Sequence, residues 1–192
     1  MSNNPITIFD QWFTEAKKHD IQECEAVNLA TATKDGVPSN RTVLLKEYDE
    51  FGFVFFTNLE SRKGLELKEN PFVSLCFYWK ELGKQVRIEG RANQVSDKEA
   101  TEYFDSRPLQ SRIGAHVSQQ SRVIKSDFDL VKEVAKKTAE MIGKKVERTA
   151  YWSGFRVTPH KIEFWQKGNF RVHRRHLYRL EDGVWEMELL YP

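Results

Sequence analysis

The spacing of apolar and polar positions changes between the start of the chain and the part that follows. From Pro5 to Lys18 apolar residues recur at i, i+3, i+4 and i+7, which predicts an amphipathic helix. From Ala26 onward, short apolar or alternating runs are separated by turn-forming residues, a pattern typical of strands. The predicted strands are Ala26–Thr33, Ser39–Lys46, Phe51–Asn58, Val73–Trp79, Gln85–Val95, Gly154–Thr158, Lys161–Lys167, Arg171–Leu180 and Val184–Leu190.

Helical patterns interrupt these strands in the middle of the chain. Ser61 has the chemistry of an N-cap and Pro71 of a stop signal, so a short helix is expected between them. Asp97–Ser106 and a longer stretch near Phe128–Ile142 are predicted to be helical as well, with a turn at Pro108. Many short strands joined mainly by turns favour a mainly β fold with peripheral helices, an antiparallel barrel, over a doubly wound parallel sheet. The glycine-rich motifs of the common nucleotide-binding βα folds are absent from the sequence.

Composition narrows the class of protein further. The chain has 192 residues, which predicts one domain over residues 1–192 that can bury its core without disulfides. The net charge of +2 gives no global case for nucleic-acid binding. Cys24 and Cys76 match no metal-ligand spacing and are expected to be buried as small apolar side chains. Because no secretory signal or membrane-length apolar run occurs, the default expectation is a cytoplasmic protein.

Two cations occupy an unfavourable place at the start of a predicted helix. Arg62 and Lys63 fall in the first turn after Ser61, where the helix dipole is already positive. A bound anion would reverse this penalty, since free backbone N–H groups and two cations form a phosphate site. Solvated surface cations are an equally good interpretation of this feature alone.

A second candidate anion site lies where the helix Asp97–Ser106 ends. Tyr103, Arg107 and Ser111 follow one another at intervals of four, and Pro108 forces the chain to change direction. They could hold a phosphate, although taken alone an ordinary helix end is the better interpretation. Arg41 and Lys46 bracket an apolar strand, and a period of two places them on opposite faces unless a bulge intervenes.

The segment Arg171–His176 concentrates three arginines and two histidines in six residues. A metal site is a poor interpretation, because neighbouring cations would repel the ion and no carboxylate or thiolate accompanies His173 and His176. An anion or an electron-rich ring fits better, and Phe164 and Trp165 upstream supply aromatic walls for a planar ligand. An exposed basic strand remains the alternative. No nucleophile motif such as G-x-S-x-G is present.

Taken in order, ten short blocks resemble the pyridoxamine 5′-phosphate oxidase family along nearly the whole chain. Each block is modest alone, but their order and spacing are specific. The blocks are Leu29–Thr31, Arg41–Lys46, Phe56–Gly64, Asn70–Pro71, Trp79 with Gln85–Gly90, Tyr103–Ser121, Trp152–Val157, Ile162–Gln166, Arg171–Arg175 and Pro192.

The resemblance implies an FMN-binding split β-barrel that forms a homodimer, with two FMN molecules in clefts between the subunits. It implies oxidation of pyridoxine or pyridoxamine 5′-phosphate to pyridoxal 5′-phosphate, with dioxygen as acceptor and hydrogen peroxide as product. Arg171 and His173 would lie over the pyridine ring as catalytic residues, and with Lys46, Tyr103, Arg107 and Ser111 they would bind the substrate. The implied FMN contacts are Arg41, Thr42, Val43, Leu44, Leu45, Lys46, Phe56, Thr57, Arg62, Lys63, Gln85, Gln120, Ser121, Trp165 and Arg175.

Departures from the family pattern lie at the substrate end. Family members carry a segment before the first helix that closes over the substrate, and this chain starts at that helix, which predicts a missing or replaced lid. The family's R-L-H-D-R block has Arg174 at its fourth position here, a charge reversal expected beside the site. Other candidate functions are a sister FMN oxidase of the phenazine-biosynthesis type, a non-catalytic flavin or pyridoxal-phosphate binding protein, and a basic RNA-binding barrel. Retention of Lys46, Tyr103, Arg107 and Ser111 favours the vitamin B6 oxidase, whereas the missing lid and Arg174 favour the sister oxidase.

Overall fold

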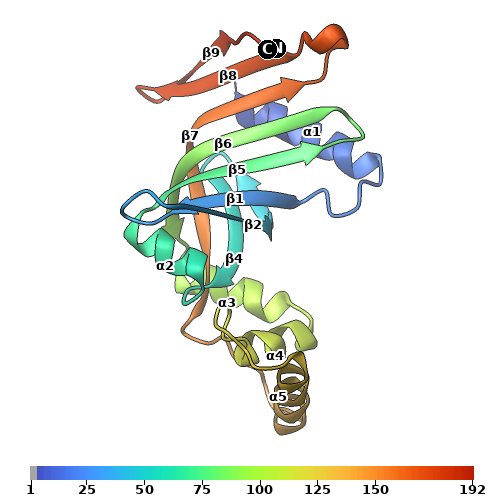
Figure 1. Ribbon diagram of the computed structural model, residues 1–192, viewed down its shortest axis with the longest axis vertical. Helices are drawn as coiled ribbons and strands as arrows, with labels where there is room; N and C mark the ends of the chain where they lie inside the picture. Colours follow the sequence, from blue (N-terminus) through green and yellow to red (C-terminus); the bar gives the residue numbers. More distant parts are fainter. Residues whose placement is uncertain (1–3) are drawn as a thin grey trace.

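The computed structural model describes residues 4–192, which form nine strands and five α-helices. Figure 1 shows the helices α3 to α5 gathered at one end of the molecule and the hairpin of β8 and β9 at the other. No helix in this part of the chain is long and apolar enough to cross a bilayer. The helices are α1 (Pro5–Lys18), α2 (Arg62–Glu69), α3 (Asp97–Ser106), α4 (Leu109–Val117) and α5 (Asp127–Glu140), and a 3₁₀ turn covers Asn169–Arg171. The strands are β1 (Ala26–Ala32), β2 (Pro38–Leu44), β3 (Glu47–Asp49), β4 (Gly52–Asn58), β5 (Phe72–Trp79), β6 (Lys84–Gln94), β7 (Trp152–Gln166), β8 (Arg174–Glu181) and β9 (Val184–Leu189).

All strands belong to one antiparallel sheet that curls on itself (Figure 1). Its main path runs β2-β1-β5-β6-β7-β4-β3, and β8 and β9 extend it from β7. The long strand β7 therefore has two partners on the same side: its first half pairs with β4 and its second half with β8. This division splits the curled sheet into a barrel part and a flat C-terminal extension.

Helix α1 closes the barrel with a single apolar face. Phe9, Phe13 and Ala16 are buried, as the spacing of three and four residues requires. The ring of Phe9 lies 4.9 Å from that of Phe53 and 5.2 Å from that of Phe77, both in edge-to-face geometry. Complete burial of one such ring stabilises the fold by about 1.5–3 kcal/mol, so α1 is an integral part of the core.

The mainly β prediction is confirmed, and α1 has the predicted bounds. The two predicted strands around Pro159 are instead one continuous strand, β7. Gly90 pairs with Pro159 and Glu89 with Lys161, so His160 forms a bulge opposite them. A bulge removes the need for a ladder N–H, which proline cannot supply.

Two elements were not predicted from the sequence. Strand β3 has only three residues, too few for a visible alternation. Helix α4 follows Pro108 directly, although the sequence predicted only a turn there. Pro108 makes no side-chain capping bond and Gly114 lies within the helix, so neither of the usual helix signals is present.

Candidate functional site

A cleft of about 880 Å³ opens between the barrel and the helices α3 and α4. Strands β2 and β4, the first turn of α2, and the loop after α4 also contribute to its walls. Fourteen of the predicted site residues meet here: Arg41, Thr42, Val43, Leu44, Lys46, Phe56, Thr57, Arg62, Lys63, Gln120 and Ser121 from the FMN set, and Tyr103, Arg107 and Ser111 from the substrate set.

The first turn of α2 is fixed by contacts on three sides. Ser61 caps the helix, with its Oγ accepting a bond from Gly64 N. Gly64 approaches the backbone so closely that a Cβ there would lie 2.3 Å from the carbonyl oxygen of Leu59. The loop beyond α4 covers the turn from outside, since Ser121 Oγ accepts from Arg62 N at 3.2 Å and Gln120 Oε1 from Lys63 Nζ at 2.9 Å. The two cations are therefore held in place by a segment nearly sixty residues away in the sequence.

The cleft is strongly cationic. Its described lining includes Arg41, Lys46, Arg62, Lys63 and Arg107, and no Asp or Glu. Lys63 is only 7% exposed. Burial, and secondarily the positive charge of Arg41, lower the pKa of Lys63 to about 8. Such a cluster is unfavourable without an anion, which supports the phosphate-site interpretation of the first turn of α2.

The other end of the cleft contains a stack of aromatic rings with a cation beside it. The rings of Phe56 and Tyr103 are parallel with centroids 3.9 Å apart, and Trp152 continues the stack 5.4 Å from Phe56. The guanidinium of Arg107 lies 4.8 Å from the Trp152 ring centroid. Its Nη1 is buried and has no hydrogen-bond acceptor among the described residues. A buried donor without a partner is costly in a native protein, which supports the interpretation of this region as a second anion site.

Arg41 and Lys46 both line the cleft, and the prediction that they lie on opposite faces is wrong. Strand β2 ends at Leu44, so the alternation no longer applies at Lys46. Between them Leu45 points the other way and is buried in the core at 5% exposure. Leu45 is thus the one member of the predicted stretch Arg41–Lys46 that does not line the cleft.

The remaining five predicted site residues lie outside this cleft: Gln85 on β6, Trp165 on β7, Arg175 on β8, and Arg171 and His173 in the segment between β7 and β8. Gln85 pairs with Trp165, and Trp165 pairs with Arg175, so these three form a row across β6, β7 and β8. The ring of His173 lies 4.6 Å from that of Trp165. Arg171 is exposed and has a φ of 64°, next to Phe170 with a φ of 54°. Two successive left-handed non-glycine residues are strained, as is common where a side chain is presented for function.

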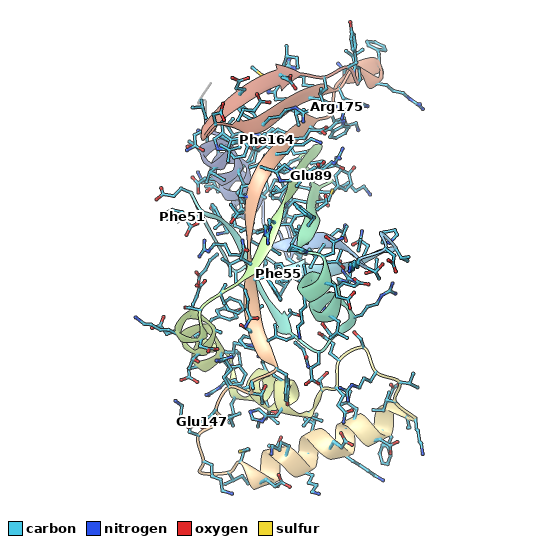
Figure 2. All side chains as sticks on the ribbon, turned by 90° about the vertical axis from the view of Figure 1, so that its left-hand side faces the viewer. Phe51, Phe55, Glu89, Glu147, Phe164 and Arg175 are labelled. Atoms are coloured by element: carbon cyan, nitrogen blue, oxygen red, sulfur yellow. The ribbon has the colours of Figure 1, made fainter. Side chains whose placement is uncertain are left out.

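Figure 2 shows Arg175 near one end of the molecule, beyond Glu89, whereas Glu147 lies at the opposite end. The row is stabilised by Glu163, which is 5% exposed and accepts from Arg175 Nε at 2.8 Å and Arg87 Nη1 at 3.2 Å. One chain therefore has two separate groups of predicted site residues.

Arg174 faces away from this row. It pairs with Gln166, and both line a small pocket against α1 together with His176. Successive residues of a strand point to opposite faces, so Arg174 lies on the reverse side of the sheet from Arg175. The positive charge of Arg174, which was expected beside the site, therefore does not face the predicted site residues of its own chain.

One residue that organises the cleft, the buried Glu66 of α2, was not predicted from the sequence. Its Oε1 accepts from Arg62 Nε at 2.9 Å, and its Oε2 accepts from Ser39 Oγ at 2.5 Å. The spacing of four residues between Arg62 and Glu66 is a recognisable signal for such a pair on a helix.

Two family models match this chain. Residues 13–166 match the family model for pyridoxamine 5′-phosphate oxidase, and residues 152–192 match that for the pyridoxine 5′-phosphate oxidase C-terminal dimerisation region. The chain is 48% identical over 192 residues to a pyridoxine/pyridoxamine 5′-phosphate oxidase of Zymomonas mobilis, covering 100% of both proteins. A protein of the same name from Bacteroides fragilis is 46% identical, with 100% of this chain and 82% of that protein covered.

Solved structures give the same result for the fold. PhzG from Burkholderia lata, solved in complex with tetrahydrophenazine-1-carboxylic acid, matches with a TM-score of 0.95 and 32% identity, covering 100% of this chain and 94% of that one. A pyridoxamine 5′-phosphate oxidase-related FMN-binding protein from Nostoc punctiforme matches with a TM-score of 0.77 and 17% identity, with both chains covered completely. These likenesses confirm the expected split-barrel fold. The two family models and the full-length relatives show that the chain belongs to the pyridoxamine 5′-phosphate oxidase family of FMN-dependent oxidases.

Proposed function

We propose that this protein oxidises pyridoxine 5′-phosphate or pyridoxamine 5′-phosphate to pyridoxal 5′-phosphate, with dioxygen as the final electron acceptor. The observation that carries the proposal is the cleft itself. It brings a cationic helix terminus, for the FMN phosphate, together with Lys46, Tyr103, Arg107 and Ser111, for the substrate phosphate. Two cationic regions in one cleft suit a reaction between two phosphorylated molecules.

The residues present fit FMN. Lys63 is buried against two neutral acceptors, Ser61 Oγ and Gln120 Oε1, and keeps one proton for a further partner. Arg62 donates from its Nε to Glu66, and within residues 4–192 neither terminal NH₂ group has a partner, so both are available to a phosphate. These groups would hold the phosphate end of the cofactor, and Thr42, Val43 and Thr57 would contact the remainder.

When bound, FMN would supply the acceptor for a hydride from the C4′ carbon of the substrate, with dioxygen taking up the electrons as hydrogen peroxide. Pyridoxine 5′-phosphate would give the aldehyde directly, whereas the imine from pyridoxamine 5′-phosphate would be hydrolysed by water, which releases ammonia. The protein's own part is to bind and orient. Arg107 and Lys46 would fix the substrate phosphate, and Arg171 and His173 would hold the pyridine ring so that its C4′ carbon faces the flavin. Such alignment is a large source of rate acceleration in bimolecular reactions.

The second group of residues supports a shared site in a homodimer. Gln85, Trp165, Arg175, Arg171 and His173 lie outside the cleft of their own chain. We propose that they complete the cleft of a partner subunit. The match of residues 152–192 to a C-terminal dimerisation region supports this arrangement, because β8 and β9 belong to that region.

A direct assay tests the proposal. Purified protein loaded with FMN is incubated with pyridoxine 5′-phosphate and with pyridoxamine 5′-phosphate, and the aldehyde and hydrogen peroxide are measured together. One equivalent of each per substrate oxidised is expected. No turnover of either substrate by FMN-loaded protein would contradict the proposal.

The similarity to PhzG keeps a sister oxidase as the second candidate. That structure contains tetrahydrophenazine-1-carboxylic acid, which has a carboxylate and no phosphate. Peroxide formation with that acid, and none with the two phosphates, would favour the second candidate.

A further inference from the structure

The buried carboxylate of Glu66 lies directly behind the cations of the cleft. Glu66 is 4% exposed, one helical turn after Arg62, and does not line the cleft itself. On its far side are β1 and β2, where Thr31 pairs with Ser39 and Leu29 pairs with Arg41. Ser39 and Arg41 are two residues apart on β2 and therefore share the face that meets α2.

Glu66 receives hydrogen bonds from four side chains. Its Oε1 accepts from Arg62 Nε at 2.9 Å. Its Oε2 accepts from Thr31 Oγ1, from Ser39 Oγ at 2.5 Å and from Arg41 Nη2 at 3.3 Å. Burial alone would raise the pKa of Glu66, but the bonds from Ser39, Thr31 and Arg62 outweigh it and lower the pKa to about 2. The carboxylate is thus ionised at any physiological pH.

These contacts restrict both arginines. Arg41 is fixed from two sides, because its Nη1 donates to the carbonyl of Leu29 at 3.3 Å and its Nη2 donates to Ser39 and Glu66. Among the described residues Arg62 is held at Nε, and its side chain, which lines the cleft, is 58% exposed to solvent. Glu66 therefore fixes the Nε end of the Arg62 guanidinium and leaves the two terminal NH₂ groups for a ligand.

The same carboxylate also sets the charge of this end of the cleft. Arg41, Arg62 and Lys63 carry three positive charges, and Glu66 removes one, which leaves a net charge of +2. A phosphate monoester carries a charge of about −1.5 to −2 at neutral pH. The local charge therefore matches the ligand without a large excess of repulsion among the cations.

We propose that Glu66 is a positioning residue for the cofactor phosphate, acting through Arg62 and Arg41. The proposal rests on the proposed placement of that phosphate at Arg62 and Lys63. A positioning role and a purely electrostatic role of Glu66 predict opposite effects of Glu66→Gln on the affinity for FMN. Loss of a negative charge alone would tighten binding of an anion, whereas loss of the bonds to the two arginines would weaken it.

The test measures the dissociation constants of FMN and riboflavin for the apoprotein by quenching of flavin fluorescence. Glu66→Gln is expected to weaken FMN by at least about tenfold, the effect of a lost charge-assisted hydrogen bond, and to leave riboflavin within about twofold, since riboflavin lacks the phosphate. Glu69→Gln is the matched control, because it removes the same charge from an exposed position of the same helix. It should leave both dissociation constants unchanged.

Unchanged or tighter FMN binding in Glu66→Gln would overturn the proposal, and so would an equal loss for both flavins, which would indicate a purely structural role. Thr31→Val keeps the test decisive if Glu66→Gln does not fold. It removes a hydroxyl that donates to Glu66 and accepts from Arg41 while conserving side-chain shape. It should weaken FMN by about threefold relative to riboflavin, less than Glu66→Gln, because the hydroxyl reaches the phosphate only through Glu66 and Arg41, and an unaltered ratio would count against Glu66.

The double variant Arg62→Ala/Lys63→Ala distinguishes a failure of the proposed role of Glu66 from a failure of the proposed phosphate position at Arg62 and Lys63. If the double variant still prefers FMN over riboflavin as strongly as the wild type, the phosphate lies elsewhere and both proposals fail. If the double variant loses that preference while Glu66→Gln keeps it, only the role of Glu66 is refuted.

Discussion

At the scale of single residues, Lys63 determines how the cleft responds to pH. Its ammonium group is buried beside the cation of Arg41, and its pKa is lowered to about 8 by burial first and by Arg41 second. A bound phosphate dianion favours the charged form, so the pKa of Lys63 is higher in the complex than in the free protein. Binding of FMN above pH 8 must then take up a proton.

The affinity for FMN is therefore expected to change little between pH 7 and pH 8 and to fall as the pH rises above 8, by up to about tenfold per pH unit. Riboflavin, which has no phosphate, should show no such dependence in the same range. The measurement is a fluorescence titration of the apoprotein with both flavins between pH 7 and pH 9.5. In Lys63→Arg the slope should disappear, because a guanidinium stays charged throughout; an unaltered slope in that variant would assign the titration to another group.

Arg107 gives a second prediction at the residue scale. Its buried Nη1 lacks an acceptor among residues 4–192, and its guanidinium lies against Trp152 and Phe104. If it binds the substrate phosphate, Arg107→Ala should raise KM for pyridoxine 5′-phosphate by about 10- to 100-fold, the range for a hydrogen bond to a charged group. The affinity for FMN should not change. Steady-state kinetics on the FMN-loaded variant measure this, and a fall in kcat at constant KM would instead place Arg107 at the reacting atoms.

At the scale of elements, predictability depended on whether the signal was local. Helix α1 has a proline in its first turn and a clear apolar stripe, so its bounds followed from the sequence. Helix α4 has neither, and the continuity of β7 through Pro159 depends on the bulge at His160, which is a property of its pairing with β6. Likewise, the side chain of Lys46 reaches the cleft because β2 ends at Leu44, and no period along the strand encodes that end.

The site followed the same rule. The cationic first turn of α2 was visible in the sequence, because an unfavourable charge at a helix terminus is a local anomaly. The hydrogen bonds that position this turn and Glu66 were not visible in the sequence, because their partners come from distant segments. These partners are Gln120, Ser121, Ser39 and Thr31. Resemblance to a family supplied positions for most site residues, but it did not supply Glu66, which no quoted block marks as functional.

The close approach of Gly64 in α2 to Leu59 in the preceding loop predicts that a larger residue at position 64 destabilises the protein. In Gly64→Ala the new Cβ would lie 2.3 Å from the carbonyl oxygen of Leu59, and backbone atoms cannot yield as a side chain does. The variant should lose about 1–3 kcal/mol of stability, which corresponds to a fall in Tm of about 2–4 °C per kcal/mol for a chain of this size. Calorimetry of the apoprotein measures this.

Gly114→Ala is the matched control for that substitution. Gly114 lies within a helix as well, but a Cβ there meets nothing within 4 Å. Alanine should stabilise this helix by about 0.5–1 kcal/mol relative to glycine. If Gly64→Ala is as stable as the wild type, the close contact between α2 and Leu59 is not a constraint on the fold.

At the scale of the whole molecule, the important feature is the separation of two groups of site residues. Arg107 lies in the cleft beside the helices, whereas the row containing Trp165 and Arg175 lies on the C-terminal extension of the sheet. In Figure 2 Arg175 marks the end of the molecule opposite to Glu147, which precedes β7. A homodimer in which each extension completes the partner's cleft would give two equivalent sites, each built from both chains.

Mixed dimers test this arrangement directly. Arg107→Ala damages the cleft, and Arg171→Ala damages the group proposed to reach into the partner's cleft. Each variant alone should stay dimeric and bind FMN, yet lose at least about tenfold in kcat/KM, or roughly 1.4 kcal/mol of transition-state stabilisation. In a mixed dimer one site carries both substitutions and the other carries neither. After unfolding and refolding an equal mixture, about half of the dimers are mixed, so activity should rise to about a quarter of the wild-type value.

The control is to refold each variant separately and mix the two only afterwards, which should give no gain before subunits exchange. If the co-refolded mixture is no more active than that control, each site is contained within one chain and the shared-site model is refuted.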